Sequence, residues 1–325
     1  MGATICMILE PLTMQTNNQI KELNVQLRAD DKSGANLLPN TLIIGVQKSS
    51  TSWLSARLAQ HPEVFVVPGE VHYFDRASNF DRGPDWYRKL FAQAGQARIR
   101  VEKSGAYFWT TCENVPDEPQ DKPERIDALL SGVRLIVMLR DPVARAYSAW
   151  NHIVRSGRAR ERGSAPDLFD PEIARDVHIH GILTRGLYHA QLSRYLETFP
   201  RERILVLTQE QDVIAAPEEG MAKVCRFLDI DTDVSFAGLD RVDNRYDGTC
   251  FANHLMLAAP NAMHPALHRL DRYILSRLPL KRLPYPKGDA QTRKRLADYY
   301  EDDCRKLADL IGPLPNSWLG GRLAG

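Results

Sequence analysis

The feature that most constrains the fold of this chain is an alternation of short apolar runs and amphipathic segments that begins at Thr41. Apolar runs rich in β-branched residues occupy residues 41–47, 63–67, 97–103, 133–140 and 203–210. Between them, apolar side chains recur with helical spacing, as at Trp53, Leu54 and Leu58. Strands that alternate with helices predict an α/β fold: a central, mostly parallel sheet between two helical layers, in a three-layer α/β/α arrangement. The C-terminal third is predicted to be helical.

Length and composition define the domain organisation and argue against some classes of protein. Among the 325 residues, we expect residues 1–38 to form a loosely attached N-terminal extension and residues 39–320 to form a single domain. The formal net charge of +1 gives no support to nucleic-acid binding. No apolar run is long enough for a transmembrane helix. The five cysteines are widely spaced and lack a C-x-x-C pair, which favours a reducing compartment, so we expect a cytoplasmic protein.

Three segments directly follow expected strands, where a ligand site is expected in a fold of this class. They cover residues 45–52, 102–107 and 140–148. In a parallel sheet, the carboxyl ends of the strands meet at one edge, and ligands bind in the crevice beyond that edge. We therefore expect these three segments to build the binding site together.

The first of these segments, GVQKSSTSW, looks like a phosphate-binding loop in which the lysine has moved. A Walker-type loop has the form G-x-x-x-x-G-K-[ST], whereas Lys48 lies three residues after Gly45 and no second glycine follows. The backbone N–H groups at a helix N-terminus and the Lys48 ammonium group can both bind an anion. Four hydroxyl groups add further donors: Ser49, Ser50, Thr51 and Ser52. The alternative is an ordinary capped helix with a surface lysine.

Other candidate residues carry groups suited to anion binding or proton transfer. Arg140 ends the strongest predicted strand and can hold an anion bidentately, and Ser148 lies on the helix that follows. In GEVHYFD, Glu70 and His72 project on one side if the segment is extended, so they can supply a general base and a proton partner. Lys103 also lies at the carboxyl end of a predicted strand.

Together, these motifs resemble those of the sulfotransferases that use 3′-phosphoadenosine 5′-phosphosulfate (PAPS). The family's 5′-phosphosulfate loop has the form K-x-G-T-[ST]-x-L, and residues 48–54 match it except that Ser50 replaces the glycine. Its 3′-phosphate motif, R-[DN]-P-x-x-R-x-x-S, matches residues 140–148 throughout. GEVHYFD and EKSGAYF are similar to K-E-[VL]-H-F-F-D, apart from its first lysine, and to E-K-[ST]-x-x-Y-[FL]. These acceptor-side segments belong to the heparan sulfate and related bacterial branch. The resemblance covers roughly residues 42–318.

The resemblance implies a P-loop-kinase-like sulfotransferase fold and a set of residue roles. Lys48 would steady the sulfuryl group and the leaving phosphate oxygen. Glu70 would be the general base, with His72 and Lys103 orienting it or the sulfuryl group, although the choice between Glu70 and His72 as the base stays open. The family usually has a Lys/Arg-Gly loop late in the chain, for which PYPKGDAQTR is the local candidate. The implied cofactor-binding residues are Lys48, Ser49, Ser50, Thr51, Ser52, Trp53, Arg140, Ser148, Lys287 and Gly288.

The implied reaction is in-line transfer of a sulfuryl group from PAPS to a hydroxyl or amine, with 3′-phosphoadenosine 5′-phosphate (PAP) as product and no metal ion required. We expect a carbohydrate or small-molecule alcohol as acceptor, and a lipid or polyketide hydroxyl is an alternative. The run RSGRARERG is expected either to lie near the acceptor entrance or to be a solvated loop; its arginines are Arg155, Arg158, Arg160 and Arg162. The alternative functions are a kinase-like phosphotransferase and a non-catalytic PAP or glycan binder. The oligomeric state stays open.

Overall fold

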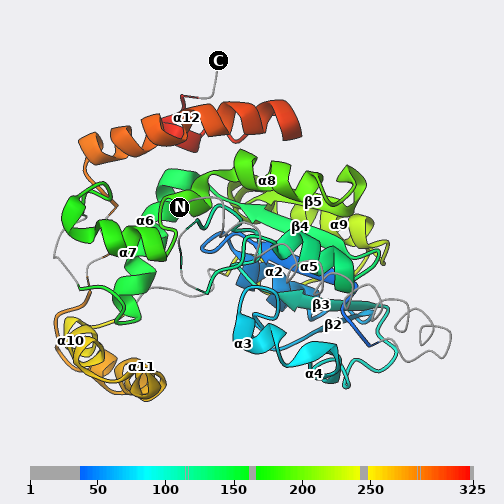
Figure 1. Ribbon diagram of the computed structural model, residues 1–325, viewed down its shortest axis with the longest axis horizontal. Helices are drawn as coiled ribbons and strands as arrows, with labels where there is room; N and C mark the ends of the chain where they lie inside the picture. The colour runs from blue at the N-terminus through cyan, green and yellow to red at the C-terminus, as the bar shows by residue number, and fades with distance from the viewer. Residues whose placement is uncertain are drawn as a thin grey trace, which may run out of the picture.

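A five-stranded parallel sheet forms the centre of the computed structural model, which describes residues 37–322 except 114, 116, 161–165, 242–247, 284 and 286. The strand order is β2-β3-β1-β4-β5, and each neighbouring pair is parallel (Figure 1). Ile43 of the central strand pairs with Lys103 on one side and Ile136 on the other. The strands are β1 (Thr41–Gly45), β2 (Val64–Val66), β3 (Ile99–Lys103), β4 (Arg134–Leu139) and β5 (Ile204–Thr208). The predicted α/β class is confirmed.

Helices connect the strands and form the C-terminal part. In chain order they are α2 (Thr51–Leu58), α3 (Ala77–Phe80), α4 (Gly83–Lys89), α5 (Lys122–Leu129), α6 (Pro142–Arg155), α7 (Ala174–Ile179), α8 (Tyr188–Leu196), α9 (Pro217–Leu228), α10 (Cys250–Ala258), α11 (His264–Tyr273) and α12 (Ala290–Ile311). The sequence patterns indicate most of these helices but not α3, α7 or α10. A turn of π-helix, η5 (Glu210–Ala215), follows β5.

The central strands send alternate side chains into two hydrophobic cores, one on each face of the sheet. Leu42 and Ile44 of β1 join a large core that includes side chains of α6, α8 and α12. Ile43 of the same strand joins a second core with side chains of α2 and α9. Because both faces are covered, the central runs 42–44 of β1 and 135–139 of β4 are continuously apolar rather than alternating. This arrangement gives the predicted three layers.

The order of the strands places a crevice at the carboxyl ends of β1 and β4. From β1 the chain builds β2 and β3 on one side of β1, and it then crosses to build β4 and β5 on the other side. The connections after β1 and β4 therefore leave in opposite directions, and such a switch point is where open α/β sheets bind ligands. The loop after β1 and the segment after β4 both lie at this point.

The C-terminal part confirms the helical prediction and adds a projecting unit. α12 packs against α6 and α8, and its Tyr300 and Leu307 are fully buried. α10 and α11 lie side by side and project from the lower left of the body (Figure 1). They have a small core of their own around Ala252, Met256 and Leu275. The predicted N-terminal extension lies almost entirely outside the described residues, although Leu38 is already buried in the large core.

Candidate active site

The loop between β1 and α2 holds two residues in the left-handed region that favours glycine. Lys48 has a φ of 73°, and Ser50, the N-cap of α2, has φ 67° and ψ 19°. Ser50 thus takes a conformation that suits the glycine of the resembled motif, where a Cβ atom costs about 1–2 kcal/mol. Gln209, just beyond β5, donates a hydrogen bond from Nε2 to Ser50 Oγ over 2.6 Å. The strained residue is therefore anchored to the far side of the crevice.

The neighbouring loop residues are mostly buried, and they differ in what they can offer a ligand. Ser49 is fully buried, and its Oγ has no hydrogen-bond partner among the described residues. Thr51 is also buried, at the first position of α2. The indole of Trp53 does not line the loop. It lies in the second hydrophobic core, between the sheet and α9, and its Nε1 donates to Leu239 O over 3.3 Å. Its possible contribution to anion binding is thus limited to the backbone N–H at the start of the helix.

Arg140 and Lys48 bring the two predicted phosphate motifs together. Arg140 Nη1 donates to the backbone carbonyl of Lys48 over 3.1 Å, so the segment after β4 supports the loop after β1. The pKa of Lys48 is lowered to about 8, first by burial and then by the positive charges of Arg155 and Arg140. A bound anion would relieve that repulsion. Ser148 is buried on α6, two turns beyond Arg140.

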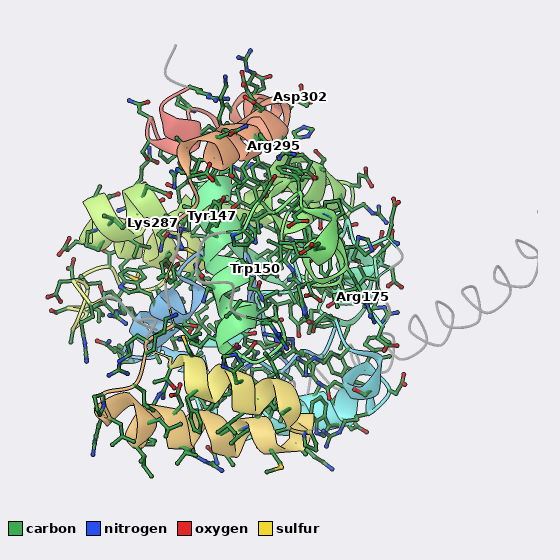
Figure 2. The ribbon with its side chains drawn as sticks, turned by 90° about the vertical axis from the view of Figure 1, so that its left-hand side faces the viewer. Tyr147, Trp150, Arg175, Lys287, Arg295 and Asp302 are labelled. Atoms are coloured by element: carbon green, nitrogen blue, oxygen red, sulfur yellow. The ribbon has the colours of Figure 1, made fainter. Side chains whose placement is uncertain are left out.

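The predicted late loop packs on the same helix beside Ser148. Gly288 has a φ of 80°, and a Cβ atom there would lie 2.2 Å from the hydroxyl oxygen of Tyr147. The Tyr147 hydroxyl is buried without a partner among the described residues, and burial raises its pKa to about 12. Lys287 is exposed close to Tyr147 (Figure 2). The structure therefore places this loop against α6, and the role of Lys287 and Gly288 in cofactor binding stays a prediction.

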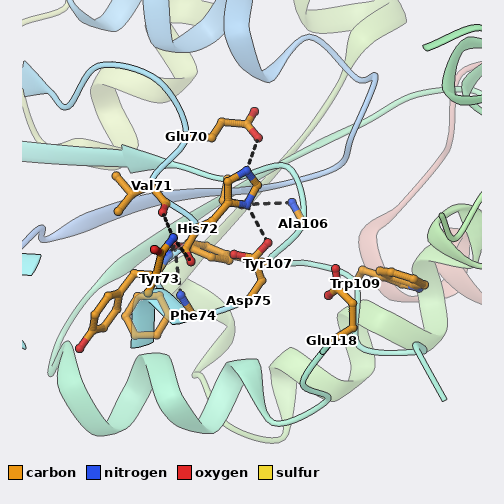
Figure 3. A network of polar contacts seen from close by, with 12 residues as sticks. Glu70, Val71, His72, Tyr73, Phe74, Asp75, Ala106, Tyr107, Trp109 and Glu118 are labelled. Atoms are coloured by element: carbon orange, nitrogen blue, oxygen red, sulfur yellow. Dashed lines mark hydrogen bonds and ion pairs between the residues drawn. The ribbon is translucent and has the colours of Figure 1, made fainter. Parts of the chain in front are cut away.

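The predicted acceptor-side residues form one polar network (Figure 3). Lys103 Nζ contacts Ser52 Oγ and Glu70 Oε1, each over 3.1 Å, and thereby joins the loop after β1 to Glu70. His72 Nε2 lies 3.4 Å from Glu70 Oε2, and its Nδ1 lies 2.8 Å from Asp75 Oδ2. The segment is not extended as assumed, because His72 has a φ of 55°. A turn, rather than strand alternation, brings Glu70 and His72 together.

The buried carboxyl group of Glu102, which the sequence analysis did not identify, supports this network through two tyrosines. Tyr107 donates its hydroxyl to Glu102 Oε1 over 2.5 Å and accepts the N–H groups of Tyr73 and Phe74 over 2.7 and 3.3 Å. The Tyr87 hydroxyl donates to the other oxygen of Glu102. Burial raises the pKa of Glu102 to about 8. The network fixes the backbone just beyond His72. The alternation of side chains along β3 could have identified Glu102 from the sequence, because it puts Glu102 and Lys103 on opposite faces of the sheet.

Further basic groups extend from Lys48 along the end of α6. Arg155 lies in the last turn of α6 rather than in a loop, while Arg158 and Arg160 are exposed and Arg162 is outside the described residues. His152 Nε2 lies 3.1 Å from Arg158 Nη2. Burial, together with the charges of Lys48 and Arg158, lowers the pKa of His152 to about 3 and keeps the ring neutral. This end of the site therefore presents positive charge.

Metal binding and membrane crossing find no support in the described part of the chain. No group of three or more His, Cys, Asp or Glu side chains among these residues is arranged to hold a metal ion. No helix that they form is long and apolar enough to cross a membrane. The described cysteines are buried free thiols, namely Cys112, Cys225, Cys250 and Cys304.

Comparison with known proteins agrees with this geometry. Heparan sulfate glucosamine 3-O-sulfotransferase 5 of Homo sapiens is 30% identical over 202 residues, which are 61% of this chain and 55% of that protein. The 3B1 enzyme of Homo sapiens is 32% identical over 201 residues, covering 60% and 47%. The chain thus spans about half the length of the curated relatives it matches.

A solved structure shows the fold of this chain, and a family model shows its family. A sulfotransferase from Alicyclobacillus acidocaldarius superposes with a TM-score of 0.60 over 86% of this chain and 98% of that one, at 22% identity, which shows a shared fold. The family model described as "Sulfotransferase domain" matches residues 38–250. That match covers well over half of the chain, and the protein therefore belongs to the sulfotransferase domain family.

Proposed function

We propose that this protein transfers a sulfuryl group from PAPS to a hydroxyl group of an acceptor. The observation that carries the proposal is the position of Lys103, which contacts both Ser52, in the first turn of α2 directly after the loop that follows β1, and Glu70 of the acceptor side. An in-line group transfer requires a donor site and a base for the incoming group, held in fixed positions relative to each other. The ammonium group of Lys103 contacts both candidate parts. Membership of the family and the match to both of its nucleotide motifs support PAPS as the donor.

The residues present fit a phosphosulfate and a second phosphate. Ser49 Oγ is buried beside a helix N-terminus and has no hydrogen-bond partner among the described residues, whereas buried polar atoms usually have such a partner. With Lys48, Thr51 and Ser52 it would hold the 5′ end of the donor. Arg140 and Ser148 would hold the 3′-phosphate, with Lys287 and Gly288 packed against the same helix. When bound, PAPS supplies the sulfuryl group and a phosphate leaving group.

The chain's own residues can meet the demands of the transfer. Lys48 would stabilise the negative charge that grows on the leaving oxygen, in a partly buried position where such a charge counts for more than in water. Glu70, whose side chain is 35% exposed, would accept the proton of the incoming hydroxyl. Lys103 and His72 would keep its carboxylate oriented, while Asp75 holds His72 in turn.

We propose a carbohydrate hydroxyl as the acceptor. The relatives named above are sulfotransferases of heparan sulfate glucosamine, and the positive end of α6 around Arg155 and Arg158 would suit an anionic saccharide. A lipid or polyketide hydroxyl is the alternative within the same chemistry. A kinase-like phosphotransferase would instead require ATP and Mg²⁺, and a non-catalytic binder would bind PAP without turnover.

The test is transfer of ³⁵S from labelled PAPS to a panel of saccharides and small alcohols. Glu70→Gln is expected to lower kcat about 10²–10⁴-fold, the usual contribution of a positioned base, while leaving PAP affinity nearly unchanged. Glu202→Gln is the matched control, because Glu202 is exposed at the opposite, amino end of β5. Normal kcat for Glu70→Gln would remove Glu70 from the reaction. Transfer that depends on ATP and Mg²⁺ instead of PAPS would show a kinase.

A further inference from the structure

Exposed apolar side chains are frequent in the projecting unit that consists of α10, α11 and the turns that flank them. We define the hairpin surface as the exposed side chains of residues 249–283. Six of the ten large apolar side chains that are exposed in the described part of the chain lie there, namely Phe251, Leu257, Met263, Tyr273, Ile274 and Leu278. Tyr273 and Ile274 are 57% and 55% exposed, although water-exposed groups of this size are rarely clustered without a partner.

The same surface is positively charged, in contrast to the nearly neutral chain. Residues 249–283 contain five arginines and lysines but one acidic residue, Asp271. Asp271 is buried, where it accepts hydrogen bonds from the backbone N–H and the hydroxyl of Thr249 over 3.2 and 2.6 Å. Every charged group that this segment presents to solvent is therefore a cation: Arg269, Arg272, Arg277, Lys281 and Arg282.

The hairpin projects from the body and is firmly attached to the end of α6 (Figure 1). The two helices run side by side along the lower edge of the molecule, with α11 outermost (Figure 2). Asn253 Nδ2 donates to the carbonyl groups of Val154 and Ala159 over 2.5 and 3.2 Å, which ties α10 to the end of α6. A Cβ atom on Gly157 would lie 2.3 Å from Met256 Cβ, so the two elements pack closely.

We propose that the hairpin surface docks this protein onto an anionic lipid bilayer. Apolar and aromatic side chains beside arginine and lysine are the pattern of helices that lie in the interface, where the apolar groups enter the headgroup boundary and the cations contact lipid phosphates. A projecting unit (Figure 1) suits a flat bilayer better than an extended peptide, which requires a groove. Docking would place the end of α6 that carries Arg155 next to the membrane.

The charge argues against a second copy of this chain as the occupant. A two-fold dimer would bring two identical patches together, each with exposed positive groups and no exposed acidic group in residues 249–283 to pair with them. Like charges at short range repel unless counterions are taken up. The proposal goes beyond sulfuryl transfer and holds whether or not the acceptor itself is a lipid.

The experiment measures co-sedimentation of the full chain with phosphatidylcholine vesicles and with vesicles that also contain phosphatidylglycerol. We expect binding to the anionic vesicles, weakened by salt because surface charges are screened. Arg269→Gln combined with Arg277→Gln should weaken it about 25-fold, since each cation contributes roughly fivefold near an anionic surface. Tyr273→Ser combined with Ile274→Ser should weaken it more than tenfold through lost apolar burial.

Matched controls change the same residue types elsewhere on the surface. Ile214→Ser alters an apolar side chain that is 68% exposed on η5, and Arg305→Gln alters an exposed cation on α12; neither should change vesicle binding. Unchanged PAP affinity in the hairpin variants shows that they remain folded. Failure of the unmodified protein to bind anionic vesicles overturns the proposal. So does a dimer in light scattering that Tyr273→Ser with Ile274→Ser dissociates.

Discussion

The hydrogen bond from Gln209 to Ser50 makes a quantitative prediction about the loop that follows β1. Ser50 has the conformation of a glycine, and its hydroxyl is held by Gln209 from the end of β5. Replacing Ser50 with Gly removes the left-handed cost of about 1–2 kcal/mol but also removes a hydrogen bond worth about 1 kcal/mol, so we expect the free energy of unfolding to change by at most about 1 kcal/mol. Gln209→Ala removes the hydrogen bond alone and should destabilise the protein by about 1 kcal/mol.

The decisive quantity is the coupling between the two changes. In the Ser50→Gly background the hydroxyl is already absent, so Gln209→Ala should have almost no further effect. The double-mutant cycle should therefore give a coupling energy of about 1 kcal/mol in the free energy of unfolding. The same cycle in PAP affinity should show about fivefold weaker binding for Gln209→Ala alone, because a loop that must be reordered on binding binds less tightly.

Urea denaturation and calorimetric titration with PAP measure the two cycles. Gln211→Ala is the matched control, since Gln211 lies in the same turn but accepts a hydrogen bond from Thr208 Oγ1 over 3.3 Å instead of contacting the loop. Its effect should be the same in the unmodified protein and in the Ser50→Gly variant. A coupling energy within the roughly 0.3–0.5 kcal/mol seen between independent sites would refute the account of this hydrogen bond.

Three further predictions follow from charge and packing. PAP affinity should fall by up to tenfold per pH unit above about pH 8 as Lys48 loses its proton, and Lys48→Arg should abolish this break in a calorimetric pH series. The pKa of Glu102 is raised above its unfolded value, so its contribution to stability is complete below about pH 4.5 and is lost as the pH rises through about 8; Glu102→Gln should flatten the melting temperature over that range. Gly288→Ala should weaken PAP binding at least tenfold and also lower the melting temperature, as measured by titration and melting, because its Cβ atom would collide with Tyr147 on α6 at a positive φ.

The sequence predicted the fold well because the central strands β1 and β4 are buried on both faces. In β4 every residue after Arg134 is apolar, which distinguishes this run from the amphipathic helices on either side. The helix α10 escaped prediction because its sequence, CFANHLMLA, lacks charged residues and has no strong helical pattern of polar and apolar side chains. The proposed limits of the single domain, 39–320, stay a prediction.

The candidate site was predictable where its residues follow strands and not where it depends on long-range contacts. Lys48, Arg140 and Lys103 lie at carboxyl ends, and the parallel sheet brings them to one edge. Gln209 lies at such an end too, so the same rule applied to β5 would have found it. The network around Glu102 reaches Tyr87 and, through Tyr107, the backbone of Tyr73, and no local pattern records which partners a buried carboxyl group will have.

Calorimetric titration of PAP tests most directly the central claim that the crevice between β1 and β4 binds the sulfuryl donor. We expect PAP to bind at one site per chain and ATP to compete poorly. Arg140→Ala should weaken PAP roughly 10–150-fold, the effect of losing a charged hydrogen-bonding group of about 1.5–3 kcal/mol. Arg201→Ala, at the opposite end of the sheet, should leave affinity unchanged. Failure of the unmodified protein to bind PAP, or equal affinity for Arg140→Ala, would contradict the account.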